Sequence, residues 1–337
     1  MKTSRRFLTI AVALSLTVPA AVGTSAAVAA QDEGKFCEGT NITFFPGGPE
    51  GGPFATVVYN GAKAAEAALG PSVNYVWSNW SIDEMITGFS EAVATQPDGI
   101  AIMGHPGDDA FKPLIDDAIA QGIAVTVMNT ELQETQAAYA PVGTGYVGAT
   151  LYKAGNDLAN EAVKRAGLVE GDKAFVWGLI SEPGRGERTQ GVVDGLEAAG
   201  VEVVYLDIDS ATNADPVQGI STFTGMASAN PDLKAAFFDH GGLTNTAQSY
   251  LEAAGLGPDD LYVAGFDLGP ATVEAVENGF VDLSIDQQQW LQGFMGVLQL
   301  CLTDNFGFSG LHINTGGGFL DADNVEFIGP LVTEQIR

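Results

Sequence analysis

The sequence contains 337 residues, of which 42 are Asp or Glu and only 14 are Lys or Arg, so its formal net charge at pH 7 is −28. A charge of this sign and size argues against nucleic acid and anionic membrane surfaces as partners, because both repel an acidic protein. The length is greater than one hydrophobic core usually serves and favours two lobes.

The N-terminal segment has the pattern of an export signal. The basic residues Lys2, Arg5 and Arg6 precede a largely apolar run over residues 7–22, and a small-x-small cleavage site follows. We therefore predict a cleaved signal peptide over residues 1–30. The Arg pair leaves the Sec and Tat export routes both open. No later apolar segment is long enough to predict insertion into a membrane.

From residue 41 onward, short apolar strands alternate with helices. The predicted strands of a first set span residues 41–45, 73–77, 99–103 and 123–128, with helices over 55–69, 81–94 and 109–120. A second set has strands over 173–179, 201–206, 233–238 and 261–266, with helices over 150–166, 185–199, 215–228, 243–254 and 270–278. A strand over 281–285, a helix over 288–302 and a strand-like segment over 325–328 follow. Alternation of this length predicts right-handed βαβ units with parallel sheets, and the two sets predict two similar α/β lobes.

Two of the predicted strands run into polar side chains. Asp267 follows the strand over 261–266, and Gln287 follows the strand over 281–285. In open α/β sheets, ligands bind outside the carboxyl ends of the strands. The stretch over 265–293 is therefore the first candidate for a binding site.

This stretch resembles the signature of the periplasmic sugar-binding proteins of the ribose/galactose type, which are the substrate-binding subunits of ATP-driven sugar importers. Gly265-Phe266-Asp267 matches a family motif whose Asp contacts ligand hydroxyls, and Gln287, six positions before Gly293, matches a second motif. Position 289 departs from the family, because it is Gln here and usually Pro there. The resemblance covers essentially the whole chain beyond the signal peptide.

The resemblance implies the fold of a type I periplasmic binding protein, α/β with two doubly wound parallel-sheet lobes joined by a three-segment hinge. The N-terminal lobe would comprise residues 36–145 and 287–317, and the C-terminal lobe residues 146–286 and 318–337. The implied function is to capture a monosaccharide or related polyol in the cleft between the lobes and to deliver it to the membrane permease of an ABC importer. A periplasmic monomer without enzymatic activity, cofactor or metal is expected.

The residues that match ligand-binding positions of the family lie at predicted strand ends and helix starts. The ring of Phe54 would stack on the sugar, and the guanidinium of Arg188, three residues before Gly191, would donate a fork of hydrogen bonds. The other predicted ligand-binding residues are His105, Asn129, Thr130, His240, Asp267 and Gln287. For Arg185, in the same loop as Arg188, a solvated position and a binding role both stay open.

Two positions differ from the best-known members of the family. Asn129-Thr130 stands where ribose-type relatives often have an acid followed by Arg, and His240-Gly241 stands where Asn-Asp is usual. These departures keep a second hypothesis open, in which the same fold binds a furanosyl signal molecule or a nucleoside.

Three other functions find less support in the residues. A secreted carbohydrate-active hydrolase would need a second carboxylate opposite Asp267. A metal site at His105 and His240 would need further ligands, and no spaced carboxylate or thiol supplies them. A dinucleotide site is suggested by the motif from Gly143 to Gly148, which matches G-x-G-x-x-G. In dinucleotide-binding proteins this motif lies in the first βα unit, whereas here it follows four βα units. We interpret it as a crossing between lobes at which glycines allow bending.

The two cysteines give a structural prediction. Cys37 precedes the first strand, and Cys301 ends the helix that would return to the N-terminal lobe. Export places both thiols in an oxidising compartment, so we predict a Cys37–Cys301 disulfide that joins this helix to the edge of the sheet.

Overall fold

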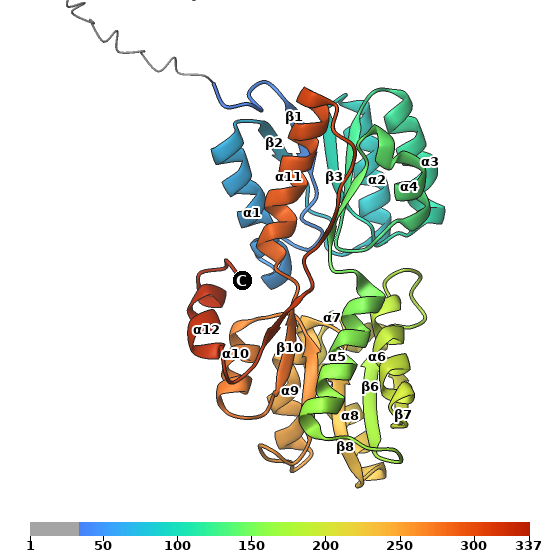
Figure 1. Cartoon of the computed structure of the whole chain (residues 1–337), viewed down its shortest axis with the longest axis vertical. Coiled ribbons are helices and arrows are strands. Elements are labelled where there is room, and N and C mark those ends of the chain that lie inside the picture. The colour runs from blue at the N-terminus through green and yellow to red at the C-terminus, as the bar shows by residue number, and fades with distance from the viewer. Residues whose placement is uncertain (1–33) are drawn as a thin grey trace, which may run out of the picture. The chain divides into compact units, whose positions relative to one another are not determined.

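The computed structural model describes residues 34–337 (Figure 1), so the predicted signal peptide lies outside the described residues. The strands of the first sheet are β1 (Asn41–Phe44), β2 (Ser72–Tyr75), β3 (Gly99–Met103), β4 (Ala124–Met128), β5 (Gly145–Gly148) and β11 (His312–Asn314). Those of the second sheet are β6 (Lys173–Gly178), β7 (Glu202–Asp207), β8 (Leu233–Phe238), β9 (Tyr262–Phe266), β10 (Leu283–Asp286) and β12 (Gly318–Leu320).

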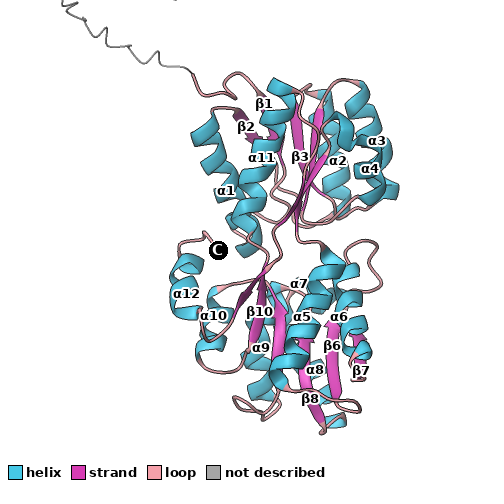
Figure 2. Ribbon diagram, in the orientation of Figure 1, coloured by secondary structure: helices cyan, strands magenta, loops and turns pink. Residues whose placement is uncertain are grey.

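Helices flank the strands of both sheets (Figure 2). They are α1 (Pro53–Leu69), α2 (Ile82–Ala94), α3 (Asp108–Ala120), α4 (Gln133–Tyr139), α5 (Leu151–Ala166), α6 (Glu187–Ala198), α7 (Ser210–Ala214), α8 (Ile220–Ala229), α9 (Gly241–Ala253), α10 (Pro270–Glu277), α11 (Gln289–Phe306) and α12 (Val325–Thr333). Short 3-10 turns are η1 (Ala140–Val142) and η2 (Pro216–Gly219). Within residues 34–337, no helix is both long and apolar enough to cross a membrane.

The two sheets have the same topology. The strand order is β11-β5-β4-β3-β1-β2 in the first sheet and β12-β10-β9-β8-β6-β7 in the second. The sheets differ at one edge, because β11 runs parallel to β5 whereas β12 runs antiparallel to β10. We call the first sheet with its helices the first lobe, and the second sheet with its helices the second lobe. The predicted class, α/β with two doubly wound parallel-sheet lobes, is confirmed.

Two strands lie where the sequence predicted them to the residue. β3 and β8 begin and end at the predicted residues. All five residues of β3 are buried, as a parallel strand covered by helices on both faces requires. The first lobe has one hydrophobic core around Phe44, Phe89 and Phe111, and the second lobe has a core on each side of its sheet.

The C-terminal segment differs from its prediction. Residues 325–328 were expected to be strand-like, and they form the first turn of α12. The buried residues of this segment are Val325, Ile328, Gly329 and Val332, and their spacing is that of one face of a helix. The predicted helix over 215–228 consists of the 3-10 turn η2 followed by α8, and it begins at Pro216 because the preceding Asp215 has an extended conformation.

The first crossing between lobes lies later than expected. Backbone pairing joins β5 to β4 and β11, so Tyr146, Val147 and Gly148 belong to the first sheet, whereas the expected division assigned them to the C-terminal lobe. The chain passes to the second lobe between β5 and α5. Gly145, part of the G-x-G-x-x-G match, lies against α11, where a Cβ atom would be 2.0 Å from the Gln299 Oε1 atom.

The other two crossings between lobes lie between β10 and α11 and between β11 and β12. They are hydrogen-bonded to each other. The side chain of Gln288 donates to the backbone oxygen of Thr315 at 2.8 Å. Gln292, buried on α11, donates to the backbone oxygen of Gln287 at 3.2 Å and to Thr315 Oγ1 at 3.3 Å. The buried carboxylate of Asp286 is paired with Arg337, whose Nε atom lies 2.7 Å from Asp286 Oδ2.

Each lobe contains one pair of helices that cross with their backbones in close approach. A Cβ atom on Gly61 of α1 would lie 1.9 Å from the Trp290 backbone oxygen on α11. In the second lobe, a Cβ atom on Gly155 of α5 would lie 1.9 Å from the Arg188 backbone oxygen on α6. Only glycine fits at these two points, and the second of them sets the position of a predicted ligand-binding residue.

The predicted disulfide between Cys37 and Cys301 is confirmed. The Cα atoms of the two residues are 5.5 Å apart, and both side chains are fully buried in the core of the first lobe. The bond joins α11 to the segment that precedes β1. It is a feature of the first lobe alone within the described residues.

Candidate functional site

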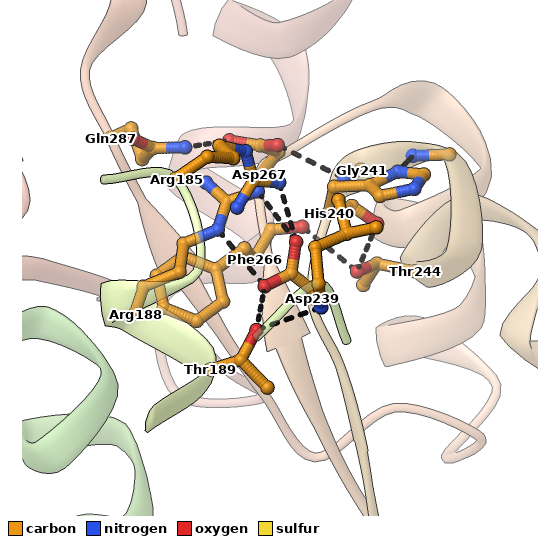
Figure 3. Close-up of polar contacts among 12 residues, drawn as sticks. Arg185, Arg188, Thr189, Asp239, His240, Gly241, Thr244, Phe266, Asp267 and Gln287 are labelled. Carbon is orange, nitrogen blue, oxygen red and sulfur yellow. Dashed lines mark hydrogen bonds and ion pairs between the residues drawn. The ribbon is translucent and has the colours of Figure 1, made fainter. Parts of the chain in front are cut away.

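The carboxyl ends of the second sheet bring together polar residues that are far apart in the sequence (Figure 3). Asp239 follows β8, Asp267 follows β9, Gln287 follows β10, and Arg188 lies in the first turn of α6, which follows β6. All four residues are buried. Three of these four were predicted ligand-binding residues, and Asp239 was not among the predictions.

Asp239 is the centre of a buried charge cluster. Its carboxylate accepts from Arg185 Nη2 at 2.5 Å, from Arg188 Nη2 at 3.1 Å and from the Thr189 hydroxyl at 2.5 Å. Burial opposes the charge of this carboxylate, but the two guanidinium groups outweigh it and hold the pKa of Asp239 well below its usual range. Asp239 is therefore an ionised anchor for both arginines.

Arg188 is held on three sides. Its guanidinium lies 4.7 Å from the centre of the Phe266 ring, its Nε and Nη2 atoms contact Asp239, and the backbone approach at Gly155 fixes its carbonyl group. Burial, followed by the neighbouring Arg185, lowers the pKa of Arg188, while Asp239 and Asp267 oppose that shift. A guanidinium fixed in this way presents its remaining donors in a set direction.

Asp267 is oriented by an unusual backbone conformation. Its φ angle is 71°, in the left-handed region that Asp tolerates better than most residues. The carboxylate accepts from the Gly241 backbone N–H at 2.9 Å and from Gln287 Nε2 at 2.6 Å, and Gln289 Nε2 lies 3.5 Å away. Gln289, at the position where the sequence departs from the family, thus contacts the same carboxylate as the predicted Gln287.

His240 caps helix α9 and presents one ring nitrogen. Its Nδ1 atom accepts from the Gly242 backbone N–H at 3.1 Å, so the neutral ring carries its proton on Nε2. Burial lowers the pKa of His240 to about 3, with Arg185 and Arg188 adding to the shift and Asp239 opposing it. The ring is neutral at pH 7 and acts as a hydrogen-bond donor through Nε2.

The first lobe contributes aromatic rings and neutral side chains. The rings of Phe54 and Trp80 are 5.5 Å apart, and those of Trp80 and His105 are 5.2 Å apart. Burial, with Arg185 and Arg188 adding to it, lowers the pKa of His105 to about 3. Trp80 was not among the predicted residues, and its ring lies on the loop before α1, where a Cβ atom on Gly47 would be 2.5 Å from it.

Asn129 and Thr130, at the end of β4, have different surroundings. The side chain of Asn129 is directed to α11, with Nδ2 3.4 Å from Gln292 Oε1, and its backbone oxygen accepts from the Tyr146 hydroxyl at 2.9 Å. The Thr130 side chain is fully buried. A Cβ atom on Gly184 would lie 3.5 Å from Thr130 Cγ2, so the loop before Arg185 reaches the end of β4.

The strand ends of both lobes carry buried polar atoms that have no hydrogen-bond partner among the described residues. These atoms are His105 Nδ1, Thr130 Oγ1, Arg185 Nη1, His240 Nε2, Gln287 Oε1 and Gln289 Oε1. Buried polar groups are nearly always hydrogen-bonded, because desolvation without a partner is costly. A concentration of such atoms at one place is typical of a binding site for a polar ligand.

A comparison with protein families agrees with this geometry. A family model described as the periplasmic binding protein domain matches residues 42–302. The chain belongs to this family. The family predicted from the motifs around Asp267 and Gln287 is thereby confirmed.

Two curated sugar-binding proteins are similar to this protein along most of its length. The xylose/arabinose-binding protein XylF of Sulfolobus acidocaldarius is 26% identical over 275 residues, which are 77% of this chain and 66% of that protein. The D-ribose/D-allose-binding protein of Pseudomonas aeruginosa is 25% identical over 248 residues, which are 72% of this chain and 76% of that protein. The chain thus spans slightly less than two thirds of the length of the Sulfolobus relative.

Solved structures share the fold of this periplasmic binding protein. A carbohydrate transporter from Acidothermus cellulolyticus in complex with myo-inositol has a TM-score of 0.74 at 23% identity, with 88% of this chain and 99% of that chain covered. An ABC transporter solute binding protein from Burkholderia graminis in complex with D-arabinose has a TM-score of 0.75 at 21% identity, with 86% and 98% covered. These likenesses confirm the two-sheet α/β fold.

Proposed function

We propose that this periplasmic binding protein is the substrate-binding subunit of an ABC importer and captures a neutral monosaccharide or polyol between its lobes. Its signal peptide would direct it to the periplasm, where the loaded monomer would dock on a membrane permease. The relatives named above support this class of ligand, since their names or structures refer to xylose, arabinose, ribose, allose and myo-inositol.

The mixture of unpartnered donors and acceptors is the observation that carries the proposal. Arg185 Nη1 and His240 Nε2 can only donate, whereas Gln287 Oε1 and Gln289 Oε1 can only accept. A hydroxyl group both donates and accepts, so one polyhydroxylated molecule can satisfy all four atoms. A carboxylate or phosphate would leave the two glutamine oxygens without donors.

The charge of the site also favours a neutral ligand. The two positive groups, Arg185 and Arg188, face the two negative groups, Asp239 and Asp267, and both histidines are neutral at pH 7. An ionic ligand would add an unpaired charge to this site, and burial of an unpaired charge is costly in free energy.

We assign the ligand contacts to residues of both lobes. Phe54, with Trp80 beside it, would give an apolar face for the C–H groups of a sugar ring, and Arg188, Asp267 and Gln287 would bind hydroxyls from the second lobe. The remaining contacts would come from His105, Asn129, Thr130 and His240. For Asn129 this role requires a shift from its contact with Gln292.

Closure of the lobes on the ligand would complete the mechanism. In the proposed division, the first lobe ends after β5 and resumes with α11, and the second lobe begins with α5 and ends with α12. Contacts that join the lobes in this structure include Gln133 Nε2 to Glu187 Oε1 at 3.3 Å and Asn60 Nδ2 to the Gln335 backbone oxygen at 3.4 Å. Such contacts would form on closure and break on release.

A hydrolase is less compatible with the geometry. Glycoside hydrolysis requires a carboxylic acid whose pKa is raised so that it can protonate the leaving group. Asp239 is the second carboxylate near Asp267, and its pKa is lowered by two arginines. Asp239 therefore fits a structural role and cannot serve as the acid.

A thermal-shift screen of the mature protein tests the proposal. The panel would contain pentoses, hexoses, deoxy sugars, inositols and nucleosides. A ligand at 100 times its Kd should stabilise the folded protein by about 2.7 kcal/mol and raise its Tm. Asp267→Ala should abolish the shift, whereas Asp157→Ala, at an aspartate whose side chain is 44% exposed, should preserve it. A shift with nucleosides only, or with no compound, would overturn the proposal.

A further inference from the structure

Arg185 has the features of a ligand-binding residue that the family signature does not include. The residue is buried, with 7% of its surface exposed, and its contact with a side chain is the bond from Nη2 to Asp239. Its second terminal nitrogen, Nη1, is buried and has no partner among the described residues. A solvated position for Arg185, which the sequence left open, is thereby excluded.

The Asp239 carboxylate fixes the direction of Arg185. Asp239 also accepts from Arg188 and Thr189, so its oxygens are fully engaged inside the second lobe. In Figure 3 both guanidinium groups converge on this carboxylate from the side on which Asp267 and Gln287 lie. The free face of Arg185 is therefore on the side of the proposed binding site and not on that of the core.

The first lobe meets Arg185 with neutral groups. The adjacent Gly184 lies against Thr130, whose Oγ1 atom is itself buried and unpartnered. Burial, with the charge of Arg185 adding to it, lowers the pKa of His105, so this ring of the first lobe is neutral. A donor of the second lobe and a hydroxyl of the first lobe are thus both buried without a protein partner, on two segments that meet at Gly184.

We propose that Arg185, held by Asp239, is a second ligand-binding arginine that selects ligands with an oxygen between Arg185 and Thr130. This inference rests on the proposed sugar-binding function and adds a specificity determinant to it. One hydroxyl of the sugar accepts from Arg185 Nη1 and exchanges a hydrogen bond with Thr130 Oγ1. The ligand thereby bridges the two lobes at this point.

Calorimetric titration of a set of deoxy sugars tests the assignment. The probe is the sugar with the largest thermal shift in the screen, with its monodeoxy analogues, titrated into the wild type, Arg185→Met and Arg185→Lys. Arg185→Met should weaken binding of the parent sugar by about 10- to 100-fold, since the lost hydrogen bond involves a charged donor. One deoxy analogue should bind the wild type and Arg185→Met equally, because it lacks the hydroxyl that Arg185 contacts.

Matched variants separate this role from a merely structural one. Arg165→Met removes an arginine of the second lobe that pairs with Glu161 and Asp321 near the surface, and it should leave every affinity unchanged. If Arg185→Met does not fold, Arg185→Lys keeps the charge beside Asp239 and should still lose at least about fivefold in affinity, because Lys lacks the second donor arm.

Two results would overturn the assignment while leaving the proposed function intact. One is wild-type affinity of Arg185→Met for the parent sugar, combined with loss of binding in Arg188→Met. The other is an equal loss for every deoxy analogue, which would indicate a general disturbance of the site. Failure of all sugars to bind the wild type would overturn the proposed function and this inference with it.

Discussion

The second lobe gathers charged side chains at its strand ends, whereas the first lobe offers aromatic rings and neutral groups at the corresponding ends. Arg185, Arg188, Asp239 and Asp267 all belong to the second lobe. Yet the two lobes share one strand order and one close helix crossing. The same backbone plan therefore supports two different chemistries, and the difference comes from the residues directly after each strand. Variants can test how far the stability of each lobe depends on its own side chains and close contacts.

Acid should destabilise the protein through one histidine of each lobe. His105 and His240 have pKa values lowered to about 3, compared with about 6.5 in an unfolded chain. Between these values the unfolded state binds more protons, so stability falls as pH decreases. At pH 4 each histidine should cost about 2 to 3 kcal/mol relative to pH 7, measured by urea unfolding.

Single variants assign this loss to the lobes. His240→Asn and His105→Asn should each reduce the difference between pH 7 and pH 4 by about the same 2 to 3 kcal/mol. The acid sensitivity that remains should appear below about pH 4, where Asp239 takes up a proton in the unfolded chain but stays ionised beside its two arginines in the folded protein. An unchanged pH dependence in both variants would contradict the assignment.

The two helix crossings should respond alike to an added methyl group. Gly61→Ala in the first lobe and Gly155→Ala in the second each place a Cβ atom 1.9 Å from a backbone oxygen, so the helices must separate. We expect each to lower the free energy of unfolding by about 3 kcal/mol. Gly155→Ala should also weaken ligand binding more than Gly61→Ala does, because the displaced oxygen belongs to Arg188.

Gly225→Ala is the control for these crossings. Gly225 lies in helix α8, and a Cβ atom there would meet no neighbour within 4 Å. Alanine should therefore stabilise the protein by about 0.5 to 1 kcal/mol, through the lower entropy of the unfolded chain. Destabilisation at this site as large as at Gly61 would mean that close approach to a backbone oxygen is not the cause of the losses at the two crossings.

Removal of the disulfide should affect the first lobe and not the second, with a smaller loss in the free energy of unfolding. The double variant Cys37→Ser/Cys301→Ser should lose about 2 to 3 kcal/mol, because the bond restricts the unfolded chain over a separation of 264 residues. Amide hydrogen exchange should accelerate in β1, β3 and α11 and change little in β6 and β8. Reduced wild-type protein should reproduce this pattern, and equal acceleration in both lobes would contradict it.

Local sequence determined most of the scaffold and part of the site. The apolar run of β3 could be placed to the residue, since a parallel strand that helices cover on both faces is buried throughout. Asp267 and Gln287 were predicted because polar residues directly after apolar strands lie at the ligand-binding edge, and Arg188 and His240 because they match ligand-binding positions of the family. The segment over 325–328 was misread because four residues are too few to distinguish the strand period from the helix period.

The residues that sequence reasoning missed depend on contacts between distant segments. Trp80 acquires its place from the glycine loop more than thirty residues earlier. The role of Asp239 depends on Arg185 and Arg188, which are 54 and 51 residues away. Gln289 signalled itself only as a departure from the family motif. No local sequence pattern marks such residues, because their role depends on side chains that folding brings from distant parts of the chain.

The disulfide and helix α11 also fix the order in which the protein can be assembled. Most of the second lobe is a continuous run, from α5 to β10, which can fold as soon as it emerges from the ribosome or the export channel. The first lobe begins earlier in the chain, but its sheet is covered by α11, whose residues 289–306 come after that whole run. Contacts of such high contact order form late. Cys37 must therefore stay a free thiol beside an uncovered sheet while the second lobe folds, and nascent molecules at this stage are the ones most exposed to aggregation and mispairing.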